Sequence, residues 1–111
     1  MASVENFPTV VYLEVYDCPK LKRINCLFML HKIRIIRCPN VEVLEGVPAL
    51  DSLVLEDATM EALPGYLTGV NPRYLELVCS MELYESLSLP GSFEWNKISH
   101  IGKHNIFLLK D

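Results

Sequence analysis

The sequence predicts an α/β solenoid, an arc of about four short repeats with a parallel β-sheet on its concave face and a mostly irregular convex side. Two observations lead to this fold class. Apolar residues recur with a spacing of 20 residues, and one repeat of that length holds too few inward side chains to fold alone. The chain has 111 residues, 50% of them hydrophobic, which is the size of one domain. We therefore expect one domain made of stacked repeats.

The spacing is clearest in the first two repeats. Residues 10–24 read VVYLEVYDCPKLKRI, and residues 30–44 read LHKIRIIRCPNVEVL. A third copy, LDSLVLEDATMEAL, follows at residues 50–63, and a looser fourth copy begins near residue 72. The apolar positions that align across the first two copies are Val10, Leu13, Val15, Cys18, Leu21 and Ile24 with Leu30, Ile33, Ile35, Cys38, Val41 and Leu44. The later copies continue them with Leu50, Leu53, Leu55 and Ala58, and with Leu75, Leu77 and Ser80.

The repeat pattern LxxLxLxxC is typical of leucine-rich repeats. Side chains alternate between the two faces of a strand, so both residues of the LxL pair point into the solenoid. Strands at equal positions of successive turns run parallel, which predicts strands near residues 11–16, 31–36, 51–55, 73–77 and 105–109. Pro19 and Pro39 end the first two strands, because proline lacks the N–H donor that a ladder needs. The predicted inward pairs are Leu13/Val15, Ile33/Ile35, Leu53/Leu55 and Leu75/Leu77.

The repeats are assigned to residues 10–29, 30–49, 50–71 and 72–88, between a lead-in at residues 1–9 and a C-terminal capping segment at residues 89–111. A return path of this length has no room for a long helix, but residues 80–87 and 92–98 can each hold one or two helical turns. Phe93 and Trp95 follow the last clear repeat. We expect both rings to close the C-terminal end of the core.

The residues that alternate with the inward pairs point outward on the predicted concave face. Across the strands they form the rows Glu14–Arg34–Val54–Glu76 and Asp17–Arg37–Asp57–Cys79. Two interpretations are open. The second row could be a ladder of exposed ion pairs worth about 0–1 kcal/mol each, or the aromatic and basic side chains could form a protein-binding patch, since such residues are enriched at interface anchors. The candidate protein-binding residues are Tyr12, Glu14, Tyr16, Lys32, Arg34, Ile36, Arg37, Glu56 and Tyr74.

Composition and charge narrow the class of partner. The net charge of -4 argues against nucleic acid or an anionic membrane as the main partner. Basic residues interrupt every apolar stretch before it reaches the ~18 residues of a membrane span. The N-terminus lacks the pattern of a signal peptide, so we expect a cytoplasmic protein. Its four cysteines, none in a CxxC pair, should remain thiols there, with Cys18 and Cys38 stacked in the core.

The sequence contains no catalytic motif that we identify. It has no Gly-rich phosphate loop, no GxSxG and no HExxH. His100 and His104 have the spacing to meet on one helical face, but Gly102 lies between them and no further ligand is close in sequence. We therefore expect no catalytic residue, metal, cofactor or small-molecule ligand. The expected partner is a protein.

Three longer stretches carry a family resemblance. They are FPTVVYLEVYDCPKLKRI at residues 7–24, MEALPGYLTGVNPRYLEL at residues 60–77 and EWNKISHI at residues 94–101. Together they resemble the C-terminal leucine-rich-repeat region of plant NB-ARC/LRR disease-resistance receptors, particularly those of cereals. The likeness covers nearly the whole chain. Many repeat proteins share the pattern LxxLxLxxCxxL. Two motifs are more specific to this family, namely LPGYL followed by VNPRYLEL, and EWxKxSHI.

The resemblance implies a role in plant defense inside the cell. Such a region recognises a pathogen effector, a host protein or other receptor domains, and it holds the receptor's nucleotide switch inactive until then. The 111 residues include no nucleotide-binding module, so we expect no switching by this chain itself. Two alternatives remain. One is a substrate-recognition repeat module of a ubiquitin-ligase adaptor, which would need an adaptor-binding helical segment upstream of the repeats, and residues 1–9 are too short to hold one. The other is a non-functional receptor fragment. A fragment would self-associate through its open solenoid ends.

Overall fold

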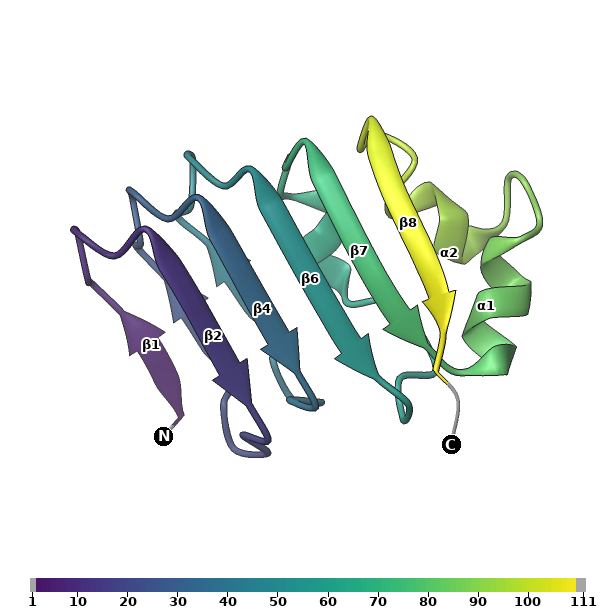
Figure 1. Cartoon of the computed structure of the whole chain (residues 1–111), viewed down its shortest axis with the longest axis horizontal. Helices are drawn as coiled ribbons and strands as arrows, with labels where there is room; N and C mark the ends of the chain where they lie inside the picture. The colour runs from purple at the N-terminus through teal and green to yellow at the C-terminus, as the bar shows by residue number, and fades with distance from the viewer. Residues whose placement is uncertain (1, 110–111) are drawn as a thin grey trace.

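The protein is a solenoid of about four turns built on parallel β-sheets (Figure 1). The computed structural model describes residues 2–109, so Met1 of the lead-in and residues 110–111 of the capping segment lie outside the described residues. A five-stranded sheet crosses the whole molecule, and all its neighbouring strands are parallel. Its strands, in spatial order, are β2 (Tyr12–Tyr16), β4 (Lys32–Ile36), β6 (Ser52–Asp57), β7 (Tyr74–Cys79) and β8 (Lys103–Leu108).

The strand register confirms the predicted repeat alignment. Leu13 pairs with Ile33, which pairs with Leu53, which in turn pairs with Leu75. The eight residues of the predicted inward pairs are buried except Leu13, which is half-buried because β2 is the edge strand. The predicted closing strand is also confirmed, since β8 pairs with β7 along its full length.

The return path of the first three turns is more regular than the sequence predicts. Strands β1 (Ser3–Glu5), β3 (Arg23–Asn25) and β5 (Val43–Glu45) form a second parallel sheet, so the prediction of a mostly irregular convex side is wrong for these turns. The constant spacing of 20 residues is the cause, because it stacks equal return segments side by side. Strand β1 lies in the lead-in, which therefore belongs to the first turn.

Short helices replace strands in the later return paths. A 3-10 helix, η1 (Gly65–Thr68), lies beside β5, and α1 (Met81–Leu87) and α2 (Phe93–Asn96) follow β7. The latter two confirm the helical turns predicted at residues 80–87 and 92–98. Each begins at a serine whose hydroxyl accepts a backbone N–H, from Leu83 to Ser80 and from Trp95 to Ser92. No helix within residues 2–109 is long and apolar enough to cross a membrane.

Strands of the first two turns end at residues with left-handed backbone. Asp17 and Arg37 have φ of 53° and 52°, and the chain then turns so that Cys18 and Cys38 approach the core. The backbone N–H of Cys18 donates to Sγ of Cys38 at 3.4 Å, which confirms the predicted stacking of the two thiols. Burial raises the pKa of the Cys38 thiol.

The third and fourth strands end differently. Strands β6 and β7 stay extended through Asp57 and Cys79, so these two side chains continue the inward alternation and are 9% and 0% exposed. The prediction that both point outward is therefore wrong. Ala58, which the alignment places inward, is exposed for the same reason. The difference lies in the backbone φ at these equivalent positions, which is positive at Asp17 and Arg37 but not at Asp57 or Cys79.

The C-terminal turn is attached to the third turn by specific side chains. Glu94 accepts the backbone N–H of Leu63 at 3.1 Å, and Nζ of Lys97 donates to the Leu63 carbonyl at 2.8 Å and to Glu94 at 3.0 Å. This buried ion pair therefore fixes α2 to the loop before η1. The Trp95 ring packs against the core as predicted, but Phe93 is 79% exposed, so its predicted capping role is wrong. Ser92 is the N-cap of α2, and a helix that starts at this position directs the Glu94 side chain inward and the Phe93 side chain outward.

Candidate functional site

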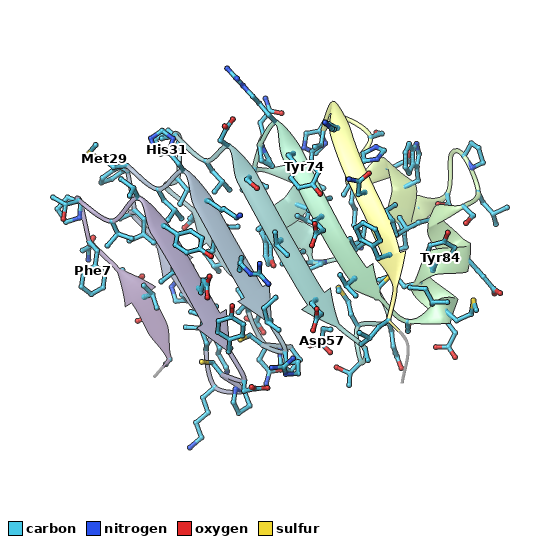
Figure 2. The ribbon with its side chains drawn as sticks, viewed as in Figure 1. Phe7, Met29, His31, Asp57, Tyr74 and Tyr84 are labelled. Carbon is cyan, nitrogen blue, oxygen red and sulfur yellow. The ribbon has the colours of Figure 1, made fainter. Side chains whose placement is uncertain are left out.

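The candidate site is the exposed face of the five-stranded sheet, which we call the sheet face. Strand pairing arranges its residues in three rows, and eight of the nine predicted binding residues lie in them. The ninth, Arg37, follows β4 in the turn. The rows are Tyr12–Lys32–Ser52–Tyr74–Lys103, Glu14–Arg34–Val54–Glu76–Asn105 and Tyr16–Ile36–Glu56–Val78–Phe107. Figure 2 shows Tyr74 near the start of β7 and Asp57 at the end of the neighbouring strand β6, so the two residues mark opposite ends of the strands.

Two tyrosines on β2 share one carboxylate. The hydroxyl of Tyr12 donates to Oε1 of Glu14, and the hydroxyl of Tyr16 donates to Oε2 at 2.5 Å. The hydrogen bond to Glu14 raises the pKa of Tyr16, because ionising the phenol would place two negative charges together. Nζ of Lys32 lies 5.8 Å from the Tyr12 ring centroid. The two rings are therefore oriented while 46% and 43% of each residue remains exposed.

Arg34 occupies the middle row and has no acidic partner in the described part of the chain. Its Nε is buried and makes no hydrogen bond, and no ion pair to it lies within 4.0 Å. The nearby acids are engaged elsewhere, since both oxygens of Glu14 accept tyrosine hydroxyls and Glu76 accepts the hydroxyl of Tyr74 at 3.0 Å. The Arg34 guanidinium lies near Tyr16 and opposes the rise of its pKa, but no acid pairs with it. Arg34 therefore offers a cation without an acidic partner in the middle row, on β4 next to the edge strand.

Two apolar residues form the floor around Arg34. Val54 pairs with Arg34 in the middle row, and it is 4% exposed. Ile36 is 3% exposed, so its predicted exposure on the concave face is wrong. It lies between the longer side chains of Tyr16 and Glu56 in its row. Ile36 therefore supports the exposed residues from below.

Arg37 supports the ion-pair interpretation at the turn edge. Its Nε and Nη2 donate to the two carboxylate oxygens of Asp17 at 2.6 and 3.0 Å, and Nη1 lies 3.3 Å from Glu56. The hydrogen bond from Arg37 lowers the pKa of Asp17. Glu56 thus takes the place that the sequence assigns to Asp57. The two open interpretations therefore divide between neighbouring arginines, with Arg37 paired and Arg34 unpaired.

The histidine pair does not share a helix. Nε2 of His100 lies 2.8 Å from the carbonyl oxygen of Val70, and His104 belongs to β8 with its ring 5.0 Å from that of Trp95. Across residues 2–109, no three His, Cys, Asp or Glu side chains are placed to hold a metal ion. His100 connects the C-terminal segment to Val70, whereas the contact of His104 with Trp95 lies within that segment.

Sequence reasoning missed a pocket at the carboxyl end of β6, where Asp57, Met60 and Tyr66 converge. Its walls come from the ends of β4 and β6 and from the loop at 58–66, which runs into the first residues of η1. The repeat does not specify the course of this loop. The one local signal is the Asp-x-Thr sequence, since Asp57 accepts both the backbone N–H and the hydroxyl of Thr59. Comparison with protein-family models, with curated proteins and with solved structures finds no match to this chain.

Proposed function

We propose that this protein is a leucine-rich-repeat-type module that binds an acidic segment of a partner protein on the sheet face. The observation that carries the proposal is the guanidinium of Arg34, which has no acidic partner within 4.0 Å among the described residues and whose Nε makes no hydrogen bond. A carboxylate from a partner can form charge-assisted hydrogen bonds there, and Arg presents its donors in a planar fork that matches a carboxylate. The exposed rings of Tyr12 and Tyr16 lie in the rows on either side.

The surroundings of Arg34 favour a protein over a small solute. The sheet face is broad, spans five strands and combines oriented tyrosines with a buried apolar floor. Tyrosine and arginine are enriched among the residues that dominate interface energies. Here Tyr12, Tyr16 and Arg34 gather on β2 and β4, at one side of the sheet. Lys32 and Lys103 in the first row add positive charge toward the same acidic partner.

The resemblance to plant disease-resistance receptors supports a more specific proposal. In that setting the module works in the cytosol, and its partner is a pathogen effector, a host protein or another domain of the receptor. The gene sequence upstream of this chain tests this. An in-frame nucleotide-binding module there supports the receptor assignment, and an unrelated upstream gene contradicts it.

Selection from a random peptide display library tests the binding proposal directly. The protein should enrich peptides that contain Asp or Glu beside apolar residues. Replacing Arg34 by Met should weaken these peptides by about 10-fold or more, as expected for hydrogen bonds to a charged group worth ~1.5–3 kcal/mol. Arg73→Met is the matched control, because Arg73 is 90% exposed, lies outside the three rows and is paired only with Asp51. Equal enrichment by both variants and the parent protein would reject the sheet face as the binding site.

A further inference from the structure

We propose that the pocket at the carboxyl end of β6 binds a primary alkylammonium group, either a free small amine or the side chain of a lysine. We call it the Asp57 pocket; it is lined among others by Ile35, Leu55, Asp57, Glu61 and Tyr66. This site lies at the strand ends and borders the sheet face at Glu56, while Arg34 is not among its lining residues. The inference is independent of the proposed function, and it replaces the expectation from sequence of no small-molecule ligand.

The size of the pocket suits a ligand as large as one side chain. Its volume is about 290 Å³, room for on the order of ten waters at ~30 Å³ each. That is close to the ~300 Å³ lower end of small-molecule sites. Ile35 and Leu55 contribute an apolar floor, and each is 3% exposed. An alkyl stem of a few carbons would bury its surface against them.

The charge of the walls selects a cation. Glu56, Asp57 and Glu61 line the pocket, and no Lys or Arg does. Glu56 is paired with Arg37, whereas within residues 2–109 no cation lies within 4.0 Å of Asp57 or Glu61. An anionic ligand would be repelled by this arrangement.

Asp57 is the central acceptor. It is only 9% exposed, and its Oδ1 accepts the N–H of Thr59 at 2.8 Å and the Thr59 hydroxyl at 2.6 Å. These two bonds orient the carboxylate, and Oδ2 makes no hydrogen bond in the described residues. A buried carboxylate is costly unless a charge or donor compensates it. Thr59 supplies two donors to Oδ1, and an ammonium group at Oδ2 would add the opposite charge.

Tyr66 provides a second recognition element. Its side chain lines the pocket, and its hydroxyl makes no hydrogen bond with any residue from 2 to 109. Burial raises the pKa of Tyr66, so the phenol stays neutral at physiological pH and keeps its O–H donor and acceptor. An aromatic ring beside a carboxylate is a common arrangement for holding an ammonium group, through its ring face and its charge.

A metal ion fits the pocket less well than an organic cation. The described part of the chain places no three acidic, histidine or cysteine side chains together as ligands. The apolar floor also cannot replace the hydration shell of Ca²⁺ or Mg²⁺, which take oxygen ligands. A second hollow, lined by Asp17, Arg37, Asp57 and Leu109, adjoins the pocket and gives a ligand-bearing chain a way in.

NMR titration of the ¹⁵N-labelled protein tests the proposal with n-butylammonium as the probe. We expect saturable amide shifts confined to the strand ends and the loop at 58–66. The neutral isostere n-butanol and the anion butyrate, which has a similar length, should give no saturable shift there. Equal responses to all three probes, a saturable response to Ca²⁺ at the same residues, or no saturation by butylammonium at millimolar concentration would each overturn the proposal.

Variants make the test specific. Asp57→Asn keeps an oxygen for Thr59 and should weaken butylammonium binding by about 10-fold, the size of a lost ~1.4 kcal/mol interaction. Glu61 is exposed, so Glu61→Gln should leave the fold intact. It should weaken binding by a smaller factor, which keeps the proposal testable if Asp57→Asn fails to fold. Glu76→Gln, on the sheet face, is the control and should bind normally. Unchanged binding in both pocket variants contradicts the assignment.

The two sources of the ligand are separated by a further comparison. N-acetyl-lysine methylamide carries the same ammonium on a peptide backbone. Tighter binding of this compound than of butylammonium assigns the pocket to a lysine of a partner chain, and weaker binding assigns it to a free amine. The Arg34→Met variant should leave both affinities unchanged, so failure of the sheet-face proposal and failure of this one are distinguishable.

Discussion

Residues 2–57 and residues 58–109 contribute strands to the same sheet, but they close their turns by different means. In the first half the spacing stays at 20 residues, and the return segments pair as β1, β3 and β5. In the second half Leu53 pairs with Leu75 and Leu75 with His104, so the spacing lengthens, and helices with a buried ion pair fill the return path. Constant spacing lets repeated backbone hydrogen bonds hold the turns together. Where the spacing varies, backbone pairing continues in the five-stranded sheet, and only the return path depends on a few side chains.

Removing the buried ion pair should give the largest effect and should act on the second half alone. Glu94→Ala leaves Lys97 and the N–H of Leu63 without their buried partner, and we expect a loss of about 3 kcal/mol in the free energy of unfolding. Denaturant unfolding measures this, and hydrogen exchange should show lost protection in α2 and β8 with β2 and β4 unchanged. Glu85→Ala is the control, since Glu85 is exposed on α1. Equal losses in the two variants would show that the ion pair does not hold this half.

A pair of glycines compares the two halves at one residue each. Gly46 and Gly91 both have left-handed backbone, with φ of 66° and 81°. A Cβ at Gly46 would lie 2.8 Å from the backbone nitrogen of Cys26, whereas one at Gly91 meets no atom within 4 Å. We expect Gly46→Ala to destabilise by about 2–3 kcal/mol and Gly91→Ala by about 1 kcal/mol, which is backbone strain alone. Similar unfolding midpoints for the two variants would argue against close packing between β3 and β5.

Cys26 offers a stabilising change in the first half. It holds a left-handed φ of 60° with a side chain that tolerates this region poorly, while Asn6 has φ of 63° one repeat earlier and tolerates it better. Cys26→Gly should raise the free energy of unfolding by about 0.5–1 kcal/mol, and Asn6→Gly should change it little. Thermal unfolding of both variants decides the point. A destabilised Cys26→Gly protein would mean that the thiol contributes more through packing than the backbone loses through strain.

The smallest expected effect concerns the exposed pair of Asp17 and Arg37. Arg37 holds the pKa of Asp17 below its ordinary value near 3.8. The contribution to stability is therefore complete above that value and is lost as the pH falls through the lower pKa of the folded protein. The unfolding temperature of Arg37→Gln should lie below that of the parent protein at neutral pH, and the two should converge once the pH falls below the lowered pKa of Asp17. Added salt should reduce the difference. Lys20→Gln is the control, and a constant difference at all pH values would rule out this ion pair as its cause.

The repeat could be predicted because stacking imposes it on the sequence. Residues at equal positions of successive turns meet the same neighbours, so Leu13, Ile33 and Leu53 must all be apolar and their register can be counted. The return sheet follows from the same spacing but was missed, since its three-residue strands carry no alternation long enough to distinguish them from loops. For the same reason, the sequence alone could assign the predicted binding residues to the strands or strand ends on which they lie. The solvent exposure of these residues could not be predicted, as the buried side chain of Ile36 shows.

The sequence by itself determined the stacking of turns, the parallel sheet and the inward pairs. Apolar residues at a fixed spacing are all buried when successive turns of equal length stack on one another. Only the tertiary structure decided which charged groups are free. Asp17 and Asp57 occupy equal positions, yet a left-handed turn places one beside Arg37 and an extended strand sends the other into a pocket. Arg34 has no acidic partner, since both carboxylate oxygens of Glu14 accept tyrosine hydroxyls. These outcomes depend on competition among partners in space, which no spacing in the sequence records.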